Sequence, residues 1–253
     1  MDHRMEVCEM KISTAFLSEI GGRERNEDTV CIRQKERNLC VFVGDGLGGY
    51  DGGKIASVAA AEAVMKHWES QGLMAETHMR AAAAAADEAV QGKQASMMGD
   101  MKTTLVALQV EGEQARWMHV GDSRLYYFRN GTLVTQTLDH SVSQMAVLMG
   151  EIPQEGIRFH ADRSRVLRAL GSGNAKPDIS PLTELKEDTA ILMCTDGFWE
   201  YVNEKEMETT LNEAKEPVDW LGKMKEILEK RVPQGNDNFS AAAVFCKAEH
   251  VCR

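Results

Sequence analysis

Four aspartates lie where a strand-like apolar run meets a glycine, serine or asparagine, and this repeated pattern constrains the fold more than any other feature. Asp45 lies in "VFVGDGLGG", Asp122 in "WMHVGDSR", Asp196 in "ILMCTDGF", and Asp237 opens "DNFSAAAVF". One Asp-Gly beside an apolar run is typical of a turn, and a turn is the better interpretation of any single copy. Four copies favour one shared explanation, in which strands from distant parts of the chain bring their terminal carboxylates together.

Strand-like segments come in groups, and helical segments lie between the groups in pairs. Between residues 105 and 138 four strand-like runs follow one another with tight connections, which favours antiparallel pairing. Helical patterns fill residues 54–91, with a break near "QGLM", and residues 203–231, where Pro217 suits a first helical turn. The pattern predicts an α+β fold in which two antiparallel sheets pack together and helices cover them on the outside.

The domain organisation is predicted to be simple. We find no internal repeat and no linker rich in Pro, Gly or Ser, so residues 1–253 are expected to form a single catalytic domain. The polar stretch at residues 150–165 interrupts the pattern. We expect a flap or short subdomain there, over about residues 141–165.

Composition excludes several classes of partner and site. The chain has 253 residues, 43% of them apolar, which is enough for a substantial core. The formal net charge is −10 and the basic residues are scattered, so we expect no nucleic acid partner. We expect neither a signal peptide nor a membrane-spanning segment, and a cytoplasmic location. Six dispersed cysteines without a C-x-x-C pair predict reduced thiols rather than zinc or disulfides.

Converging carboxylates repel one another in a partly desolvated cleft, and a bound cation relieves that repulsion. A ligand set of oxygens alone suits magnesium, manganese or calcium rather than zinc or copper. Gly46, directly after Asp45, has no side chain to keep its carbonyl away from such an ion. Two ions roughly 3.5–4 Å apart can activate a water and hold a phosphoryl group, as in phosphatases and nucleases.

The stretch "GGRERNEDTV" combines Arg23 and Arg25 with Glu27 and Asp28. Arginine's planar fork matches the oxygens of a phosphate, so this stretch could bind the substrate phosphate. A mixed charge run is equally typical of a solvated loop. The residues alone leave both interpretations open.

A series of eight short motifs resembles the metal-dependent protein phosphatases of type 2C, in their compact bacterial form. In chain order these are "RERNED", "VGDGLGG", "KTTLVAL", "VGDSRLYYFRNG", "QTLDHS", "VLRALG", "LMCTDGFWEYV" and "DNFSAAAV". Each motif is weak alone, but their common order covers nearly the whole chain. The resemblance implies a four-layer α-β-β-α sandwich, two antiparallel sheets flanked by pairs of helices.

The resemblance also implies a set of metal ligands. Asp45 is similar to the carboxylate that bridges two metals, Gly46 to the residue whose carbonyl binds the second, and Asp196 and Asp237 to the ligands of the first. The resemblance leaves two roles for Glu27, which would either orient metal-bound water, as Asp28 would, or bind a metal directly. Asp122 resembles the carboxylate that, with Asp196, binds a third and weaker ion in bacterial members.

The activity implied is hydrolysis of phosphoserine and phosphothreonine in proteins. A water bridging two Mn²⁺ or Mg²⁺ ions would attack phosphorus without a covalent intermediate, and Arg23 would bind the substrate phosphate. Arg25 has no counterpart and is expected to face solvent. The family implies phosphoprotein substrates and a cognate serine/threonine kinase as partner, and we expect a monomer.

Two positions depart from the family's pattern. Many eukaryotic members have a histidine, proposed as the general acid, where this chain has Leu47, and bacterial members often have a histidine where it has Tyr50. The leaving-group proton must then come from elsewhere. Lys102 replaces the glycine of a G-T-T element and is expected to face solvent.

Other residues and other functions were weighed beside these. We expect His140 to lie in a turn where Asp139 or Ser141 caps the following helix, and His119 to be a packed strand residue. A degenerate member that binds phosphoproteins without hydrolysis is one rival function. The intact carboxylates of the motifs argue against it. A phosphodiesterase is the other, and it would favour diester over monoester substrates.

Overall fold

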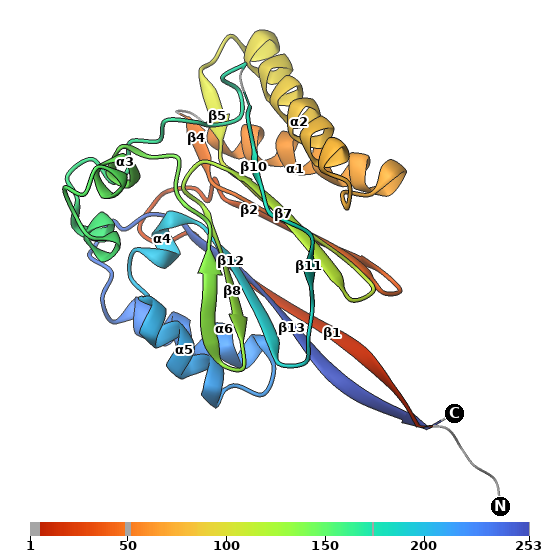
Figure 1. Cartoon of the computed structure of the whole chain (residues 1–253). Helices are drawn as coiled ribbons and strands as arrows, with labels where there is room; N and C mark the ends of the chain where they lie inside the picture. Colours follow the sequence, from red (N-terminus) through yellow and green to blue (C-terminus); the bar gives the residue numbers. More distant parts are fainter. Residues whose placement is uncertain (1–5, 49–51, 174, 253) are drawn as a thin grey trace, which may run out of the picture.

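The computed structural model describes residues 6–48, 52–173 and 175–252, which form two antiparallel sheets (Figure 1). The first sheet contains, in spatial order, β1 (Glu6–Glu19), β13 (Phe239–Cys252), β12 (Thr189–Cys194), β8 (Arg124–Arg129) and β9 (Thr132–Gln136). The second contains β10 (Asp178–Ile179), β7 (Gln114–Val120), β6 (Leu105–Glu111), β3 (Asn38–Gly44) and β2 (Thr29–Lys35), and β11 (Thr183–Glu184) also pairs with β7. A small hairpin joins β4 (Gly46–Gly48) to β5 (Met101–Thr103).

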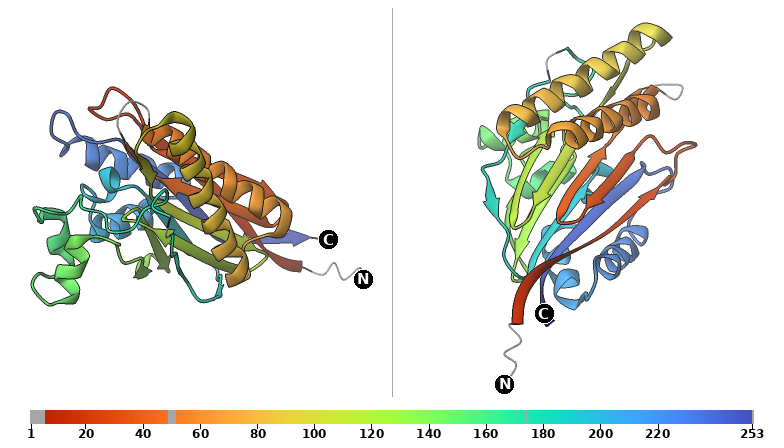
Figure 2. Two further views of the ribbon diagram at one scale, coloured as in Figure 1. Left: turned by 90° about the horizontal axis from the view of Figure 1, so that it is seen from above. Right: turned by 90° about the vertical axis from the view of Figure 1, so that its right-hand side faces the viewer.

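Two pairs of helices cover the outer faces of these sheets, as Figures 1 and 2 show from three directions. The helices α1 (Gly52–Gln71) and α2 (Glu76–Met97) pack on the second sheet. On the first sheet lie α5 (Glu204–Glu213) and α6 (Pro217–Glu229). The predicted α-β-β-α sandwich is confirmed.

Burial on both faces explains why the central strands read as continuous apolar runs rather than as alternating ones. In β3, Cys40 and Phe42 face the helices α1 and α2, whereas Leu39 and Val41 lie between the two sheets. A sheet that is covered on both sides has no solvated face, so neither set of positions can be polar. The same reasoning applies to β12, whose six residues are all buried.

The pairing within residues 105–138 is antiparallel, as predicted, but the chain changes sheets between β7 and β8, which the sequence pattern does not indicate. The four consecutive strands of residues 105–138 form two separate hairpins, β6 with β7 in one sheet and β8 with β9 in the other. Gly121, at the crossing, has φ +105°, and a Cβ there would lie 2.6 Å from Cγ2 of Thr104. Only glycine fits this turn without strain.

Helix ends follow the local signals in the sequence. Ser141 caps the short helix α3 (Val142–Leu148) by accepting a hydrogen bond from the Gln144 amide, 3.2 Å away. Of the two predicted cap residues, Asp139 and Ser141, it is therefore Ser141 that caps the helix. Pro217 occupies the first turn of α6, as predicted. The stretch predicted as a flap, residues 141–165, contains α3 and the 3₁₀ helix η1 (Gln154–Phe159).

Two further findings concern composition. No helix in the described ranges combines the length and apolar character needed to cross a membrane. Cys31, Cys40, Cys194 and Cys246 are all free thiols.

Candidate metal centre

Strand ends from both sheets bring the four aspartates of the repeated pattern to one cleft. Asp45 directly follows β3, Asp122 lies in the turn that crosses from β7 to β8, Asp196 begins the short helix α4 (Asp196–Trp199) after β12, and Asp237 lies two residues before β13. All four line a cleft of about 570 Å³. Strands from distant parts of the chain therefore bring their terminal carboxylates together, as the repeated pattern predicted.

The remaining predicted residues lie in or beside the same cleft. Arg23, Glu27 and Gly46 line it, and so does Arg25, whose side chain is exposed. Asp28 is buried behind the cleft with a relative exposure of 1%. Leu47 also lines the cleft; Tyr50 lies outside the described residues.

Burial and mutual repulsion raise the pKa values of Asp28, Asp45, Asp122 and Asp196. Desolvation is the largest cause for each, and neighbouring carboxylates add to it. The pKa of Asp45 rises well above its usual value, with Asp196 the strongest neighbour, and the pKa of Asp196 also rises well above the usual value, with Asp122 the strongest neighbour. The pKa of Asp28 is raised to about 6, and that of Asp122 to about 7. The free protein therefore cannot ionise all of these groups without cost.

The donor atoms fit a hard divalent cation. Asp28 and Asp122 each have a buried carboxylate oxygen, Oδ1, with no hydrogen-bond partner in the structure. A buried oxygen without a partner is costly, and a cation would satisfy it. Among the described residues that line the cleft, none is Cys or His, so the candidate ligand atoms are oxygens, which magnesium and manganese prefer.

Gly46 lies where no side chain fits. A Cβ at this position would lie 2.1 Å from the carbonyl oxygen of Gly53 and 2.6 Å from that of Glu27. Three backbone segments therefore meet beside Asp45, and their approach depends on the absence of a side chain. The run of glycines after Asp45 serves this close packing at the cleft as well as the turn itself.

Two threonines hold the backbone of Asp45 in place, a role that the sequence analysis did not assign. The Asp45 amide donates to Oγ1 of Thr104 at 2.8 Å, and Oγ1 of Thr103 donates to the Asp45 carbonyl at 2.8 Å. The signal was present in the motif "KTTLVAL", whose threonines follow Lys102. Lys102 itself pairs with the exposed Asp100 at 3.6 Å, not with the cleft carboxylates, in agreement with the prediction.

A buried ion pair lies beneath Asp122, and the sequence analysis also missed it. The guanidinium of Arg124 donates to both carboxylate oxygens of Asp139 at 2.8 and 2.7 Å, so Asp139 forms this pair instead of capping α3. The same guanidinium lies over the ring of Trp199, 3.4 Å from its centroid. Nε1 of Trp199 donates to the carbonyl of Asp122 at 2.9 Å, which connects the ion pair to the cleft.

Arg23 lies within the cleft and pairs with a candidate metal ligand. Its Nη2 is 2.8 Å from Oδ2 of Asp237, and both side chains are about half exposed, at 55% and 46%. Exposed ion pairs contribute little to stability, so this contact is easily exchanged. Arg23 is therefore placed where it can release Asp237 and bind an incoming anion.

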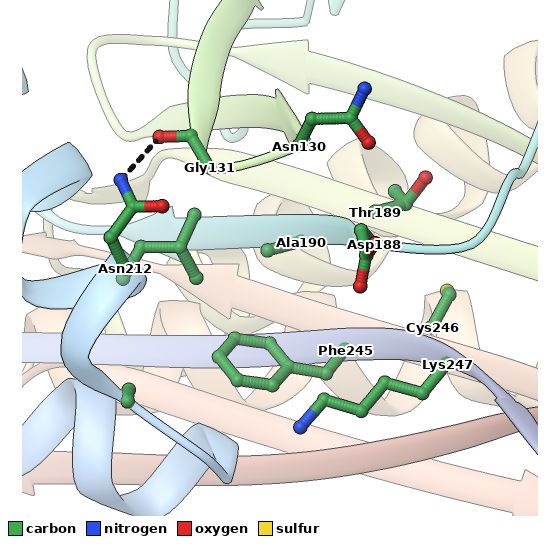
Figure 3. A pocket seen from close by; sticks show the side chains of 11 residues that line it. Asn130, Gly131, Asp188, Thr189, Ala190, Asn212, Phe245, Cys246 and Lys247 are labelled. Carbon is green, nitrogen blue, oxygen red and sulfur yellow. Dashed lines mark hydrogen bonds between the residues drawn. The ribbon is translucent and has the colours of Figure 1, made fainter.

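A second pocket, of about 360 Å³, lies at the other end of the same strands (Figure 3). It includes Ala190 near the start of β12 and Phe245 within β13, whereas the carboxylate cleft lies at the end of β12 and the start of β13. Its described lining contains one carboxylate, Asp188, and one amine, Lys247. This lining does not provide the several convergent acids that a divalent cation would require.

The chain is similar to known proteins in both sequence and fold. A family model described as protein phosphatase 2C matches residues 18–234. The chain is 34% identical over 198 residues to the serine/threonine phosphatase stp of Listeria welshimeri, covering 75% of this chain and 78% of that protein. The crystal structure of the Mycobacterium tuberculosis phosphatase PstP/Ppp superposes with a TM-score of 0.81 at 27% identity, covering 93% of this chain and 99% of that one.

A further similar structure is a complex with manganese. The catalytic domain of PstP bound to 2 manganese ions has a TM-score of 0.79 and 25% identity, covering 95% of this chain and 100% of that one. The family match spans the strand-end aspartates up to Asp196 and stops three residues before Asp237. From its motifs, its fold and these matches, the chain belongs to the protein phosphatase 2C family.

Proposed function

We propose that this protein serine/threonine phosphatase hydrolyses phosphoserine and phosphothreonine by direct attack of water, with two divalent metal ions held by its strand-end carboxylates. The observation that carries the proposal is that Asp45, Asp196 and Asp237 line one cleft together with Arg23. Acids alone would repel a phosphate. Among the described lining residues the acids outnumber Arg23 and Arg25, so a bound cation is needed before a phosphate can approach.

Each residue of the cleft has a proposed role. Asp45 would be shared between the two ions, Asp196 and Asp237 would complete the first, and the Gly46 carbonyl would bind the second. Glu27 and Asp28 would orient water around them. When bound, manganese or magnesium supplies an activated water and a positive charge that faces the phosphoryl oxygens.

Arg23 would bind the substrate phosphate through its planar fork of donors. Its present contact with Asp237 is exposed, so the guanidinium can move to the phosphate at small cost. The described lining residues include no cysteine or histidine, and the aspartates that could form an acyl phosphate are the proposed metal ligands. Because Leu47 has no proton to donate, we propose that the leaving oxygen takes its proton from water.

Asp122 is proposed to bind a weaker third ion together with Asp196. Its unpartnered Oδ1 and its position as the strongest charged neighbour of Asp196 both support this role. The substrates are proposed to be phosphorylated proteins, including a partner serine/threonine kinase, and the enzyme is proposed to act as a monomer within one domain.

The test is hydrolysis of a phosphothreonine peptide, with manganese and with a chelator. Asp196→Asn should reduce turnover by at least ~10³, the order of magnitude seen when a key electrostatic group is lost. Asp188→Asn is a matched control, because Asp188 lies at the other end of β12 with φ +56°, a conformation that asparagine tolerates. The control should retain wild-type turnover.

Other outcomes would favour the rival functions. If the wild type releases no phosphate while calorimetry shows that manganese still binds, the protein is a phosphoprotein-binding module. If a simple phosphodiester is hydrolysed faster than the monoester, the protein is a phosphodiesterase. If Asp196→Asn retains turnover at saturating manganese, the ligand assignment is wrong.

A further inference from the structure

A cluster of four polar side chains lies close to Asp122. His119 on β7, His140 after β9 and Asp178 on β10 place their potential ligand atoms within 4.8 Å of one another. The two imidazole rings stack with centroids 4.6 Å apart, and Nε2 of His140 is 3.3 Å from Oδ2 of Asp178. Arg168 contacts Oδ1 of Asp178, also at 3.3 Å. Such a cluster could be a metal site or a support for its neighbours.

The hydrogen bonds of His140 argue against a metal. Its Nδ1 accepts a hydrogen bond from the Gly121 amide at 3.1 Å, so Nδ1 carries a lone pair and the proton of the neutral ring is on Nε2. A histidine that binds a metal through Nε2 normally donates from Nδ1, the reverse of this arrangement. The Arg168 guanidinium also places a positive charge 3.3 Å from Nε2. The cluster is therefore better explained as a support.

The imidazole of His140 is held in this protonation state by its surroundings. Burial, together with the neighbouring His119, lowers its pKa to about 4, so the ring is neutral near pH 7. Nε2 lies 3.3 Å from Oδ2 of Asp178, close enough for the negative carboxylate to attract a proton on Nε2. Asp178 therefore favours the tautomer in which Nδ1 is free to accept from Gly121.

His140 holds the Gly121 peptide from two directions. Besides the contact with Nδ1, the His140 amide donates to the Gly121 carbonyl at 2.8 Å. Gly121 has φ +105° and no room for a side chain, so the chain conformation at this crossing depends on such contacts. The next residue is Asp122, whose carbonyl is held on its other side by Trp199. Contacts at both ends of this short turn therefore determine where the free Oδ1 of Asp122 lies.

We propose that His140 is a positioning residue for Asp122, and that Asp178 acts through His140 by fixing its Nε2–H tautomer. The inference rests on the proposed function, in which Asp122 binds the weaker ion. It assigns a role to residues 18 and 56 positions away in sequence from Asp122 that line no part of the cleft.

Two substitutions of His140 separate hydrogen bonding from packing. The side-chain oxygen of asparagine lies as many bonds from Cα as Nδ1 does, so His140→Asn retains an acceptor for the Gly121 amide. Glutamine places its polar atoms farther out, so His140→Gln can reach Asp178 but leaves the amide without its acceptor. The half-saturating manganese concentration for hydrolysis should rise at least ~10-fold in His140→Gln, as for other residues that orient metal ligands. In His140→Asn it should stay within ~3-fold of the wild type.

Asp178 provides a second test. Its side chain is exposed, so its replacement should not disturb folding. Asp178→Asn replaces a charged acceptor by a neutral one of roughly half the strength, so the half-saturating manganese concentration should rise about 3-fold. Glu184→Gln is the matched control, since Glu184 is an exposed acid on β11, which pairs with the same strand, β7. It should leave the manganese dependence unchanged.

A second readout needs no metal and no catalysis. Hydrogen exchange of the Gly121 amide, followed by NMR in the metal-free protein, should be at least ~10-fold faster in His140→Gln and close to wild type in His140→Asn, because only the former loses the acceptor. Equal exchange rates in these two variants would overturn the proposal. Equal half-saturating manganese concentrations in the two variants, with unchanged melting temperatures, would also overturn it.

Asp122→Asn, measured in parallel, distinguishes a failure of the proposed role of His140 from a failure of the proposed role of Asp122. If this variant raises the half-saturating manganese concentration and His140→Gln does not, His140 has no positioning role. If Asp122→Asn leaves manganese dependence unchanged, the proposed role of Asp122 in ion binding is wrong instead, and Gly121 exchange alone then decides whether His140 holds the peptide.

Discussion

The metal-free protein should lose stability as the pH rises, and Asp28 offers a direct measurement of this effect. Asp28 is buried, and its pKa is raised from 3.8 to about 6, first by desolvation and then by the charge of Asp237. A raised pKa means that the folded state binds the proton more tightly than the unfolded state does. The contribution to stability is complete below pH 3.8 and is lost as the pH rises through about 6.

The magnitude follows from the size of the pKa change. An increase from 3.8 to about 6 corresponds to about 3 kcal/mol in all, and about 2 kcal/mol of this is lost between pH 4.5 and pH 7.5. The variant Asp28→Asn is neutral at every pH and still offers an acceptor for Oγ1 of Thr195, which donates to Asp28 at 2.9 Å. Relative to the wild type, the variant should therefore gain about 2 kcal/mol between these pH values.

The assay is urea unfolding of both proteins in chelator at the two pH values. Taking the difference between variant and wild type cancels the titration of groups that Asp28 does not influence, such as Glu204 and Glu206, whose pKa values are lowered and whose pH dependence has the opposite sign. A difference that does not change with pH, or that favours the wild type at pH 7.5, would refute the reasoning.

Manganese should reverse the effect, because an ion stabilises the ionised carboxylates that repel one another without it. At 100 times its dissociation constant, an ion that binds only the folded state adds about 2.7 kcal/mol to the free energy of unfolding. The stabilisation of the wild type by manganese should be larger at pH 7.5 than at pH 4.5, and the advantage of Asp28→Asn at pH 7.5 should disappear. Equal stabilisation at both pH values, or an equal effect of sodium chloride at matched ionic strength, would contradict this account.

Three further predictions concern Arg23, Gly46 and the Arg124–Asp139 pair. Arg23→Ala should raise the Michaelis constant for a phosphopeptide about 10-fold with little change in turnover, since it removes a phosphate contact; loss of turnover alone would show a role in the transition state instead. Gly46→Ala should lower the free energy of unfolding by about 1–3 kcal/mol in urea, because the new Cβ meets backbone atoms. It should also weaken manganese binding in calorimetry. Wild-type values of both quantities would contradict the close packing at Gly46. Arg124→Met should cost about 3–5 kcal/mol in urea unfolding because it leaves Asp139 buried without a partner, whereas Arg124→Met combined with Asp139→Leu should cost less; additive losses would argue against a coupled pair.

Much of the fold and the cleft could be predicted because their signals are local and repeated. A strand such as β3 is covered on both faces, so its apolar run is visible in the sequence without knowledge of its partners. A carboxylate that follows such a run must lie at the end of a strand, whatever the order of the strands in the sheet. Asp45 and Asp196 could therefore be assigned to one site before their neighbours were known.

The crossing at Gly121 could not be predicted in the same way. A short turn between two strand-like runs has the same residues whether it joins neighbours in one sheet or carries the chain to another sheet. What decides the outcome is the close approach of Gly121 to Thr104, which lies between β5 and β6, and its hydrogen bonds to His140. Both are tertiary contacts, and pairing rules for consecutive strands do not include them.

The supports of the cleft were hidden for a related reason. Arg124 reads as a surface residue, because a charged side chain is seldom buried unless it is paired. Its partner is Asp139, 15 residues farther along the chain, and its packing surface is Trp199. A local pattern can indicate that a carboxylate faces a cleft, but it cannot indicate what holds the carboxylate there. Residues that hold ligands in place, rather than the ligands themselves, are therefore where a structure of this chain adds most to its sequence.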